Sequence, residues 1–330
     1  MNGPWGHMYQ QTTVASVPRI PRDIAVDRYR GALMLLMAGG NYLGGITWVS
    51  SVIKHTPDVG FTIADAVAPC FVFAMGLTYG PSFARRSERS LTGAYLHFVQ
   101  RYFAFIGIGA LLTAGGTAVA GQPTTWGVLQ ALGMAGLVCL PVIRVHPLPR
   151  AAVALAILGG YHIGMRAGWQ SSVFQTVQGG FFGGIAWGAL LILSTALADL
   201  RRQGTLPFLG GILVTGLIAS LSMLVIPVSK NRVSVSYLLL TLTIGAAMFL
   251  LVDVISRWST RPGPLSWWGE NPLLLYIVHL LVLGIYTIPP VPGWYANVPA
   301  WLAIVQLGVM LVIMQQAARM LHQRHVIIKL

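Results

Sequence analysis

Residues 177–198 read VQGGFFGGIAWGALLILSTALA and contain no charged side chain. A membrane-spanning α-helix needs about 20 consecutive, mainly apolar residues, so this stretch is long enough to cross a bilayer. Glycines recur at intervals of four within it, for example Gly179/Gly183 and Gly184/Gly188. Such pairs of small residues let transmembrane helices approach closely. The stretch therefore predicts a membrane helix packed tightly against its neighbours.

The composition of the whole chain indicates the same class of protein. Mean hydropathy is +0.70 and only 9% of the 330 residues are charged, whereas soluble domains have about 25%. We therefore predict an all-α, polytopic transmembrane helical bundle with about ten helices. The predicted spans are 31–50, 61–80, 102–120, 126–143, 151–165, 177–198, 206–226, 236–256, 271–288 and 300–318.

The net charge of +13 could suggest a nucleic-acid partner, but the distribution of charge argues against one. If the N-terminus is cytoplasmic, only four of the 21 Lys and Arg residues lie on the outer side: Lys54, Arg166, Lys230 and Arg232. Cytoplasmic loops of membrane proteins carry an excess of Lys and Arg. The distribution of basic residues thus predicts that both termini are cytoplasmic. We expect a multi-pass protein of the cell (inner) membrane that does not bind nucleic acid.

The chain reads as one membrane domain with short extensions. We predict a polar N-terminal arm over 1–26, a transmembrane domain over 27–318 and a basic cytoplasmic tail over 319–330. No signal peptide is visible in the first 26 residues. Cys70 and Cys139 lie in apolar segments and read as small hydrophobic residues, so we expect no metal site.

The strongest chemical signal is a histidine and an aspartate among apolar segments. Ionisable groups at membrane depth are costly and often functional. His55 titrates close enough to neutral pH to act as a general base, and Asp65 could hold its ring in one tautomer. The Asn41 amide could bind a substrate or a developing oxyanion. The structural alternative is that His55 caps a loop and Asp65 bonds a helix end.

A second group of polar residues lies late in the chain. Asn271 followed by Pro272 is a typical helix start, and Tyr276 and His279 then share one helical face. They could contact a ligand, or they could be a helix cap and a buried histidine.

Other polar residues are candidates for contact with a co-substrate. Gln130 needs a partner inside an apolar span, and either packing or a ligand could provide one. Arg85, Arg86, Arg89 and Arg101 could bind the phosphates of a cytoplasmic nucleotide-like donor, or they could set topology and touch anionic lipid.

Several motifs in one order resemble the heparan-α-glucosaminide N-acetyltransferase family and its bacterial relatives. They are Asp27-x-x-Arg30-Gly31, Asn41-Tyr42-x-Gly44-Gly45, Lys54-His55, Gly60-x-Thr62-x-x-Asp65, Pro69-x-Phe71-x-Phe73-x-x-Gly76, Gly127-Val128-Leu129-Gln130, Pro227 with Lys230-Asn231-x-x-Ser234-x-Ser236-Tyr237, and Gly269-x-Asn271-Pro272 with Tyr276-x-x-His279.

The resemblance implies an integral-membrane acyltransferase. In such enzymes an acetyl group from cytoplasmic acetyl-CoA reaches an amine or hydroxyl of a sugar or glycan on the opposite face. The histidine that matches His55 is catalytic, while Asn41 and Asp65 match residues of the same site. From their charge, polarity and place on the predicted helices, we also expect donor contacts from Arg85, Arg86, Arg101, Gln130, Asn271, Tyr276 and His279.

Two alternatives accompany this interpretation. The chain departs from the family after the histidine, where Thr56-Pro57-Asp58-Val59 replaces a segment that commonly contains tryptophan. A non-catalytic descendant that serves as a structural subunit of a larger membrane complex would explain that departure. The protein could also form a homo-oligomer. A transporter is the third possibility, but no internal repeat supports it.

Overall fold

The computed structural model describes residues 22–120 and 126–328. These residues form helices throughout, joined by loops, and contain no β-strand beyond one isolated bridge between Val59 and Ser229. The α-helices are α1 (Ile24–Gly44), α2 (Ile63–Ser87), α3 (Leu91–Ala120), α4 (Val128–Cys139), α5 (Pro147–Gly164), α6 (Gln170–Phe174), α7 (Gly180–Gln203), α8 (Thr205–Met223), α9 (Val235–Ser256), α10 (Pro264–Glu270), α11 (Pro272–Thr287) and α12 (Ala300–Gln323).

The all-α, multi-pass membrane architecture predicted from the sequence is confirmed. Within the described residues, seven helical segments are long and apolar enough to cross a membrane, and an eighth qualifies if α10 and α11, bent by 97°, form one span. Each of the ten predicted spans overlaps a helix. The count of ten membrane-spanning helices stays a prediction, because α1 carries Asp27, Arg28 and Arg30 and α4 is short. The cytoplasmic placement of the termini also stays a prediction.

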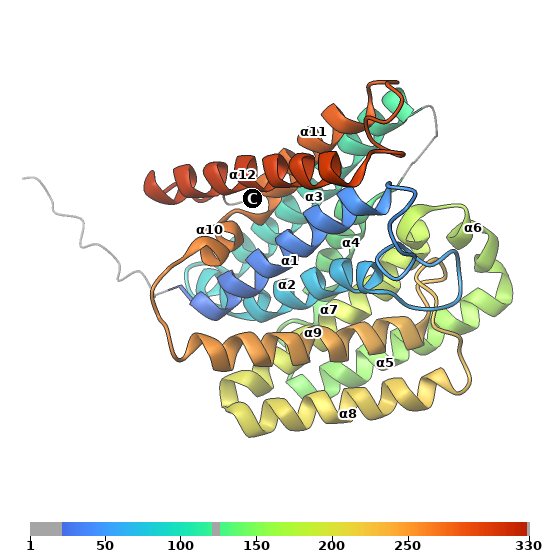
Figure 1. Cartoon of the computed structure of the whole chain (residues 1–330). Coiled ribbons are helices and arrows are strands. Elements are labelled where there is room, and N and C mark those ends of the chain that lie inside the picture. The colour runs from blue at the N-terminus through green and yellow to red at the C-terminus, as the bar shows by residue number, and fades with distance from the viewer. Residues whose placement is uncertain (1–21, 121–125, 329–330) are drawn as a thin grey trace, which may run out of the picture.

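The helix that contains most of residues 177–198 lies inside the bundle. In Figure 1, α7 runs through the bundle, with α8 along one edge and α12 along the other. The predicted glycine packing is confirmed for the Gly184/Gly188 pair: a methyl group on Gly188 would lie 2.3 Å from Val138 Cγ1, and one on Gly184 would lie 2.6 Å from Met134 Cγ. The glycines therefore allow α4 to lie directly against α7.

Two more glycines bring α1 and α10 into backbone contact. A methyl group on Gly31 would lie 1.8 Å from the Leu265 carbonyl oxygen, and one on Gly269 would lie 1.7 Å from the Asp27 carbonyl oxygen. Larger residues would push these helices apart. This contact fixes where the chain turns from α10 into α11, and so places the residues from Asn271 onward.

The described residues reach only part of the predicted extensions. Most of the predicted N-terminal arm, residues 1–21, lies outside them, and α1 begins at Ile24. At the other end α12 continues to Gln323, inside the predicted tail. The domain boundaries stay predictions.

Candidate active site

The loop after α1 is fastened to the loop between α8 and α9. Asp58 accepts hydrogen bonds from Ser229 Oγ at 2.7 Å and from Arg232 Nη2 at 2.5 Å. The Gly60 amide donates to the Val228 carbonyl at 2.9 Å. The Arg232 guanidinium, aided by Ser229, holds the pKa of the Asp58 carboxyl below its ordinary value near 3.8. The two loops thus form a single polar structure at the start of α2.

His55 and Asp65 form a direct pair beside these loops. His55 Nδ1 lies 2.7 Å from Asp65 Oδ1; the histidine side chain is 51% exposed and the carboxylate is fully buried. A proton on Nδ1 satisfies this bond, since an ionised carboxylate only accepts. The other ring nitrogen, Nε2, is then the unprotonated one. This arrangement suits a general base held by an aspartate.

The start of α2 explains why Asp65 points at His55. Its Oδ2 accepts hydrogen bonds from the Thr62 amide at 3.1 Å and the Thr62 hydroxyl at 3.0 Å, as is usual at helix N-termini. The Thr56 hydroxyl donates to the same oxygen at 3.2 Å. With Oδ2 occupied by threonines, Oδ1 is left for the imidazole. The two interpretations of Asp65 are therefore compatible: the same carboxylate can bond the start of α2 and orient the His55 ring.

Lys230 is a further charged group at this pair that received no role from the sequence. Its Nζ lies 3.8 Å from Asp65 Oδ1, and its side chain is only 15% exposed. Burial lowers the pKa of Lys230, and the nearby Asp65 carboxylate opposes that effect. Two signals were available in the sequence: its place among the four cations expected on the outer side, and its place in the Lys230-Asn231-x-x-Ser234-x-Ser236-Tyr237 motif.

Asn41 is paired with His279 rather than with His55. Its Nδ2 donates to His279 Nε2 at 2.9 Å, which joins α1 to α11. His279 is fully buried, and its ring centre lies 5.0 Å from that of Tyr276. In the part of the chain that the structure describes, no hydrogen bond connects this pair to the His55–Asp65 pair.

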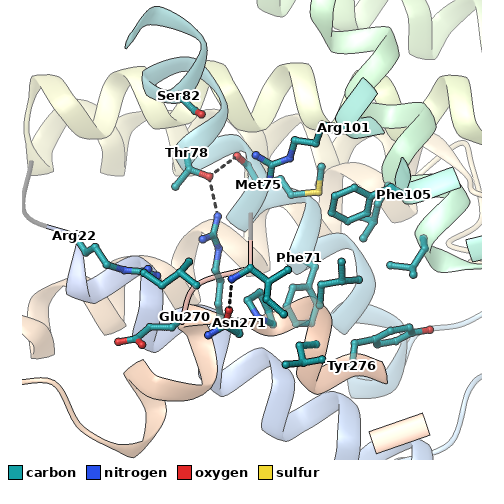
Figure 2. A pocket seen from close by; sticks show the side chains of 18 of the residues that line it. Arg22, Phe71, Met75, Thr78, Ser82, Arg101, Phe105, Glu270, Asn271 and Tyr276 are labelled. Atoms are coloured by element: carbon teal, nitrogen blue, oxygen red, sulfur yellow. Dashed lines mark hydrogen bonds between the residues drawn. The ribbon is translucent and has the colours of Figure 1, made fainter. Parts of the chain in front are cut away.

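A cavity of about 1130 Å³ lies on the opposite side of Asn41 and His279 from the loops. Figure 2 shows Thr78 and Ser82 of α2 and Arg101 of α3 along it, with Tyr276 at its far end. Its α2 wall runs from Phe71 to Arg86, about 22 Å along the axis. It is therefore an elongated space, apolar near Phe71 and basic near Arg86.

The basic end of the cavity gathers several arginines. Arg85, Arg86, Arg89 and Arg101 all line it, together with the hydroxyl groups of Ser82 and Ser90. Arg101 Nε is buried and has no hydrogen-bond partner among the described residues. Arg30, by contrast, is engaged: its Nη2 donates to Thr78 Oγ1 at 2.7 Å. The cluster offers unused donors to an anionic ligand.

The expected donor residues divide between cavity wall and structural roles. Arg85, Arg86, Arg101, Asn271 and Tyr276 line the cavity, whereas Gln130 and His279 do not. Gln130 accepts from the Gly127 amide at 3.0 Å and donates to Thr113 at 3.2 Å, so it caps α4.

Asn271 precedes α11 as expected, with Pro272 as the first helical residue. Its Nδ2 donates to the Val326 carbonyl at 3.0 Å, and its Oδ1 accepts from the Ile328 amide at 2.8 Å. The asparagine thus binds the C-terminal segment, where Ile327 and Ile328 complete the cavity wall.

A single helix connects the cavity to the histidine pair. Asp65 lies in the first turn of α2, about 9 Å along the axis from Phe71 at the inner end of the cavity. On α1, Asn41 follows the wall residue Met37 by one turn; on α11, His279 likewise follows Tyr276. The Asn41–His279 pair therefore lies about one helical turn beyond the wall residues Met37 and Tyr276, without lining the cavity itself.

Comparison with known proteins identifies relatives for the first half of the chain. Residues 22–178 match the family model described as "Heparan-alpha-glucosaminide N-acetyltransferase, catalytic". The Homo sapiens protein named heparan-alpha-glucosaminide N-acetyltransferase is 33% identical over 139 residues, which are 39% of this chain and 20% of that protein. The Mus musculus protein of the same name is 35% identical over 117 residues, 33% of this chain and 17% of that protein. The matched region spans about a fifth of these relatives' length, and the resemblance predicted from the motifs is confirmed there.

Proposed function

We propose that this chain is an acetyltransferase of the cell (inner) membrane. It moves an acetyl group from cytoplasmic acetyl-CoA to an amine or hydroxyl of a sugar or glycan on the outer face. The observation that carries the proposal is the layout of α2, with the His55–Asp65 pair at one end and the arginine-lined cavity toward the other. The family match over residues 22–178 supports the same reaction class.

The cavity suits an acyl-CoA donor entering from the cytoplasm. Guanidinium groups bind phosphates in charge-assisted, often bidentate hydrogen bonds, and Arg85, Arg86 and Arg101 supply them at the basic end of the cavity. The unpartnered Arg101 Nε supports this assignment. The apolar wall near Phe71, Met37 and Tyr276 suits the pantetheine arm and the acyl group.

His55 supplies the proton acceptor on the outer side. Its Nε2 removes the proton from the acceptor amine or hydroxyl as that atom bonds to the acyl carbon; the carbon–sulfur bond breaks, and the proton passes to the CoA sulfur. Asp65 stabilises the imidazolium through the 2.7 Å bond to Nδ1. The Asn41 amide donates to the developing oxyanion.

The donor must pass the Asn41–His279 pair to meet His55. Separation of this single 2.9 Å hydrogen bond frees the Asn41 amide for the oxyanion and opens the inner end of the cavity. We therefore assign the pair as the barrier between the two halves of the site. Bound donor favours the open arrangement only if it contacts that arrangement better than the closed one.

The altered segment after His55 supports a working site over a non-catalytic subunit. Asp58 binds Ser229 and Arg232, and the Pro57 carbonyl accepts a hydrogen bond from Asn231 Nδ2. These contacts anchor the loop while His55 and Asp65 keep their pairing. The new residues thus have a structural use that leaves the pair intact.

The test uses the purified full chain in lipid nanodiscs, with radiolabelled acetyl-CoA and glucosamine as probes. We expect acetylated glucosamine from the wild type and a loss of at least about 100-fold in His55→Ala, in line with removal of a general base. His146→Ala is the matched control, because His146 is exposed at the start of α5, and it should keep wild-type activity. Protein that neither binds CoA nor depends on His55 would refute the proposal.

A further inference from the structure

Lys230 lies against the carboxylate that holds His55. Its Nζ is 3.8 Å from Asp65 Oδ1, the same oxygen that lies 2.7 Å from His55 Nδ1. The lysine and histidine nitrogens are thus no farther apart than the sum of these distances, 6.5 Å. Asp65 is fully buried and Lys230 is largely buried, so solvent screens the field of this carboxylate and this ammonium only weakly.

The loop that carries Lys230 is fixed on both sides of it. Ser229 donates its hydroxyl to Asp58, and the Ser229 amide donates to Ser234 Oγ at 3.0 Å. On the other side, Asn231 bonds the Pro57 carbonyl and Arg232 bonds Asp58. Lys230 is therefore held at Asp65 by its backbone.

A buried carboxylate beside an imidazole stabilises the protonated ring, and a protonated ring cannot act as a general base. Opposite charge within about 4–6 Å favours the charged form of a titrating group, so Asp65 alone favours the imidazolium. A base must be unprotonated when the acceptor arrives. A cation on the same carboxylate cancels part of its field.

We propose that Lys230 is a positioning residue that sets the protonation of His55. Its ammonium offsets the Asp65 carboxylate and keeps the imidazole in its neutral, proton-accepting form at neutral pH. This inference rests on the proposed role of His55 as the base. It adds to the site a residue about 165 positions beyond Asp65 in the chain, outside the segment matched by the family model.

The other ionisable groups near the His55–Asp65 pair have partners of their own. On α9, the Tyr237 hydroxyl donates to the Asp65 backbone carbonyl at 2.7 Å. In the loops, Asp58 and Arg232 neutralise each other. Lys54 adjoins His55 in sequence, but its Nζ donates to the Thr47 carbonyl at 3.2 Å.

The test reads the titration of His55 without relying on catalysis. Diethyl pyrocarbonate modifies neutral imidazole, and mass spectrometry of the peptide that contains His55 gives the midpoint of labelling against pH. We expect Lys230→Met to move this midpoint up by about one pH unit and Lys230→Arg to leave it within a few tenths of a unit. Lys54→Met, the same substitution beside His55 without the Asp65 contact, should shift it by less than half as much.

A structural role for Lys230 would lower stability or rate without moving the midpoint. An unchanged midpoint in Lys230→Met, or an equal shift in Lys54→Met, would overturn the proposal. If Lys230→Met does not fold, Lys230→Cys is compared before and after aminoethylation, which restores an ammonium; the midpoint should rise and then return.

The two proposals fail in different ways. A wild-type protein without transfer activity would refute the proposed function, whereas the labelling midpoints would still decide the role of Lys230. If activity is present, the acidic limb of kcat/KM should shift with the labelling midpoint.

Discussion

The Arg232 guanidinium binds the Asp58 carboxylate and thereby fastens the loop of His55 to the loop of Lys230. Nη2 of the arginine lies 2.5 Å from Oδ2 of the aspartate, although 174 positions separate the residues. The same aspartate accepts from Ser229. The ion pair is therefore one of several contacts, with the Gly60–Val228 and Asn231–Pro57 hydrogen bonds, that fix the loops of His55 and Lys230 to each other.

The ion pair predicts how the loop contact responds to pH. Arg232 lowers the pKa of Asp58 below about 3.8, so the pair contributes its full stability above the ordinary Asp range. That contribution is lost as the pH falls through the lowered value, where the folded carboxylate takes up its proton. Hydrogen exchange of the Gly60 amide, corrected for its intrinsic rate, should show protection that drops only in this acidic range.

A neutral substitution tests the same contact at neutral pH. We expect Asp58→Asn to weaken the loop contact by about 1 kcal/mol, since the pair is partly exposed. Gly60 exchange should then be about fivefold faster at pH 7. Equal exchange in the variant and the wild type would show that the pair does not fasten the loops.

Asp65→Asn should remove catalysis while leaving the donor site intact. The amide keeps the shape but loses the charge that stabilises the imidazolium, and we expect kcat to fall by at least about 100-fold. Because Asp65 does not line the cavity, the Kd for CoA should stay at the wild-type value. Calorimetric titration with CoA, run beside the transfer assay, separates the two effects. A fall in affinity without a fall in kcat would contradict the assigned role.

Arg101→Met should weaken donor binding and leave catalysis nearly unchanged, the reverse of the effects expected for Asp65→Asn. Loss of a charge-assisted contact of about 1.5–3 kcal/mol predicts CoA binding weaker by about tenfold or more, with kcat changed little at saturating donor. Arg166→Met is the control, because this exposed arginine does not line the cavity and the net-charge change is the same. An equal loss of CoA affinity in both variants would indicate a general charge effect and would contradict a phosphate contact by Arg101.

Asn271→Ala should release the C-terminal segment from the cavity wall. The substitution removes two hydrogen bonds to the segment backbone, a loss of about 1–2 kcal/mol in total. We expect faster trypsin cleavage after Arg324 in the folded protein, measured by mass spectrometry. An unchanged cleavage rate would show that packing of Ile327 and Ile328 holds the segment without the asparagine.

The features predicted from sequence are those encoded locally. Apolar stretches of about 20 residues predicted the helices, and the polar residues His55 and Asp65, ten positions apart, were predicted to act together. The predicted helix start at Asn271 and Pro272 has the same origin. Each depends on residues within about 20 positions of one another.

The features missed depend on contacts between distant segments. Asn41 was grouped with His55, yet its amide pairs with His279, 238 positions away. Lys230 reaches Asp65 only because two loops dock, and Asn271 turns to the C-terminal segment. A hydrophobic pattern reports only on residues close together in the sequence. It can therefore show that a polar residue lies on an inward face, but it cannot identify a partner on a distant segment.

The central proposal is acetyl transfer across the membrane that depends on His55. Sealed vesicles containing the full chain in one orientation, loaded with labelled acetyl-CoA and given glucosamine outside, separate the two substrates by the bilayer. We predict acetylated glucosamine in the outer medium with the wild type and almost none with His55→Ala. Product only when both substrates share one side, or equal product from His55→Ala, would contradict it.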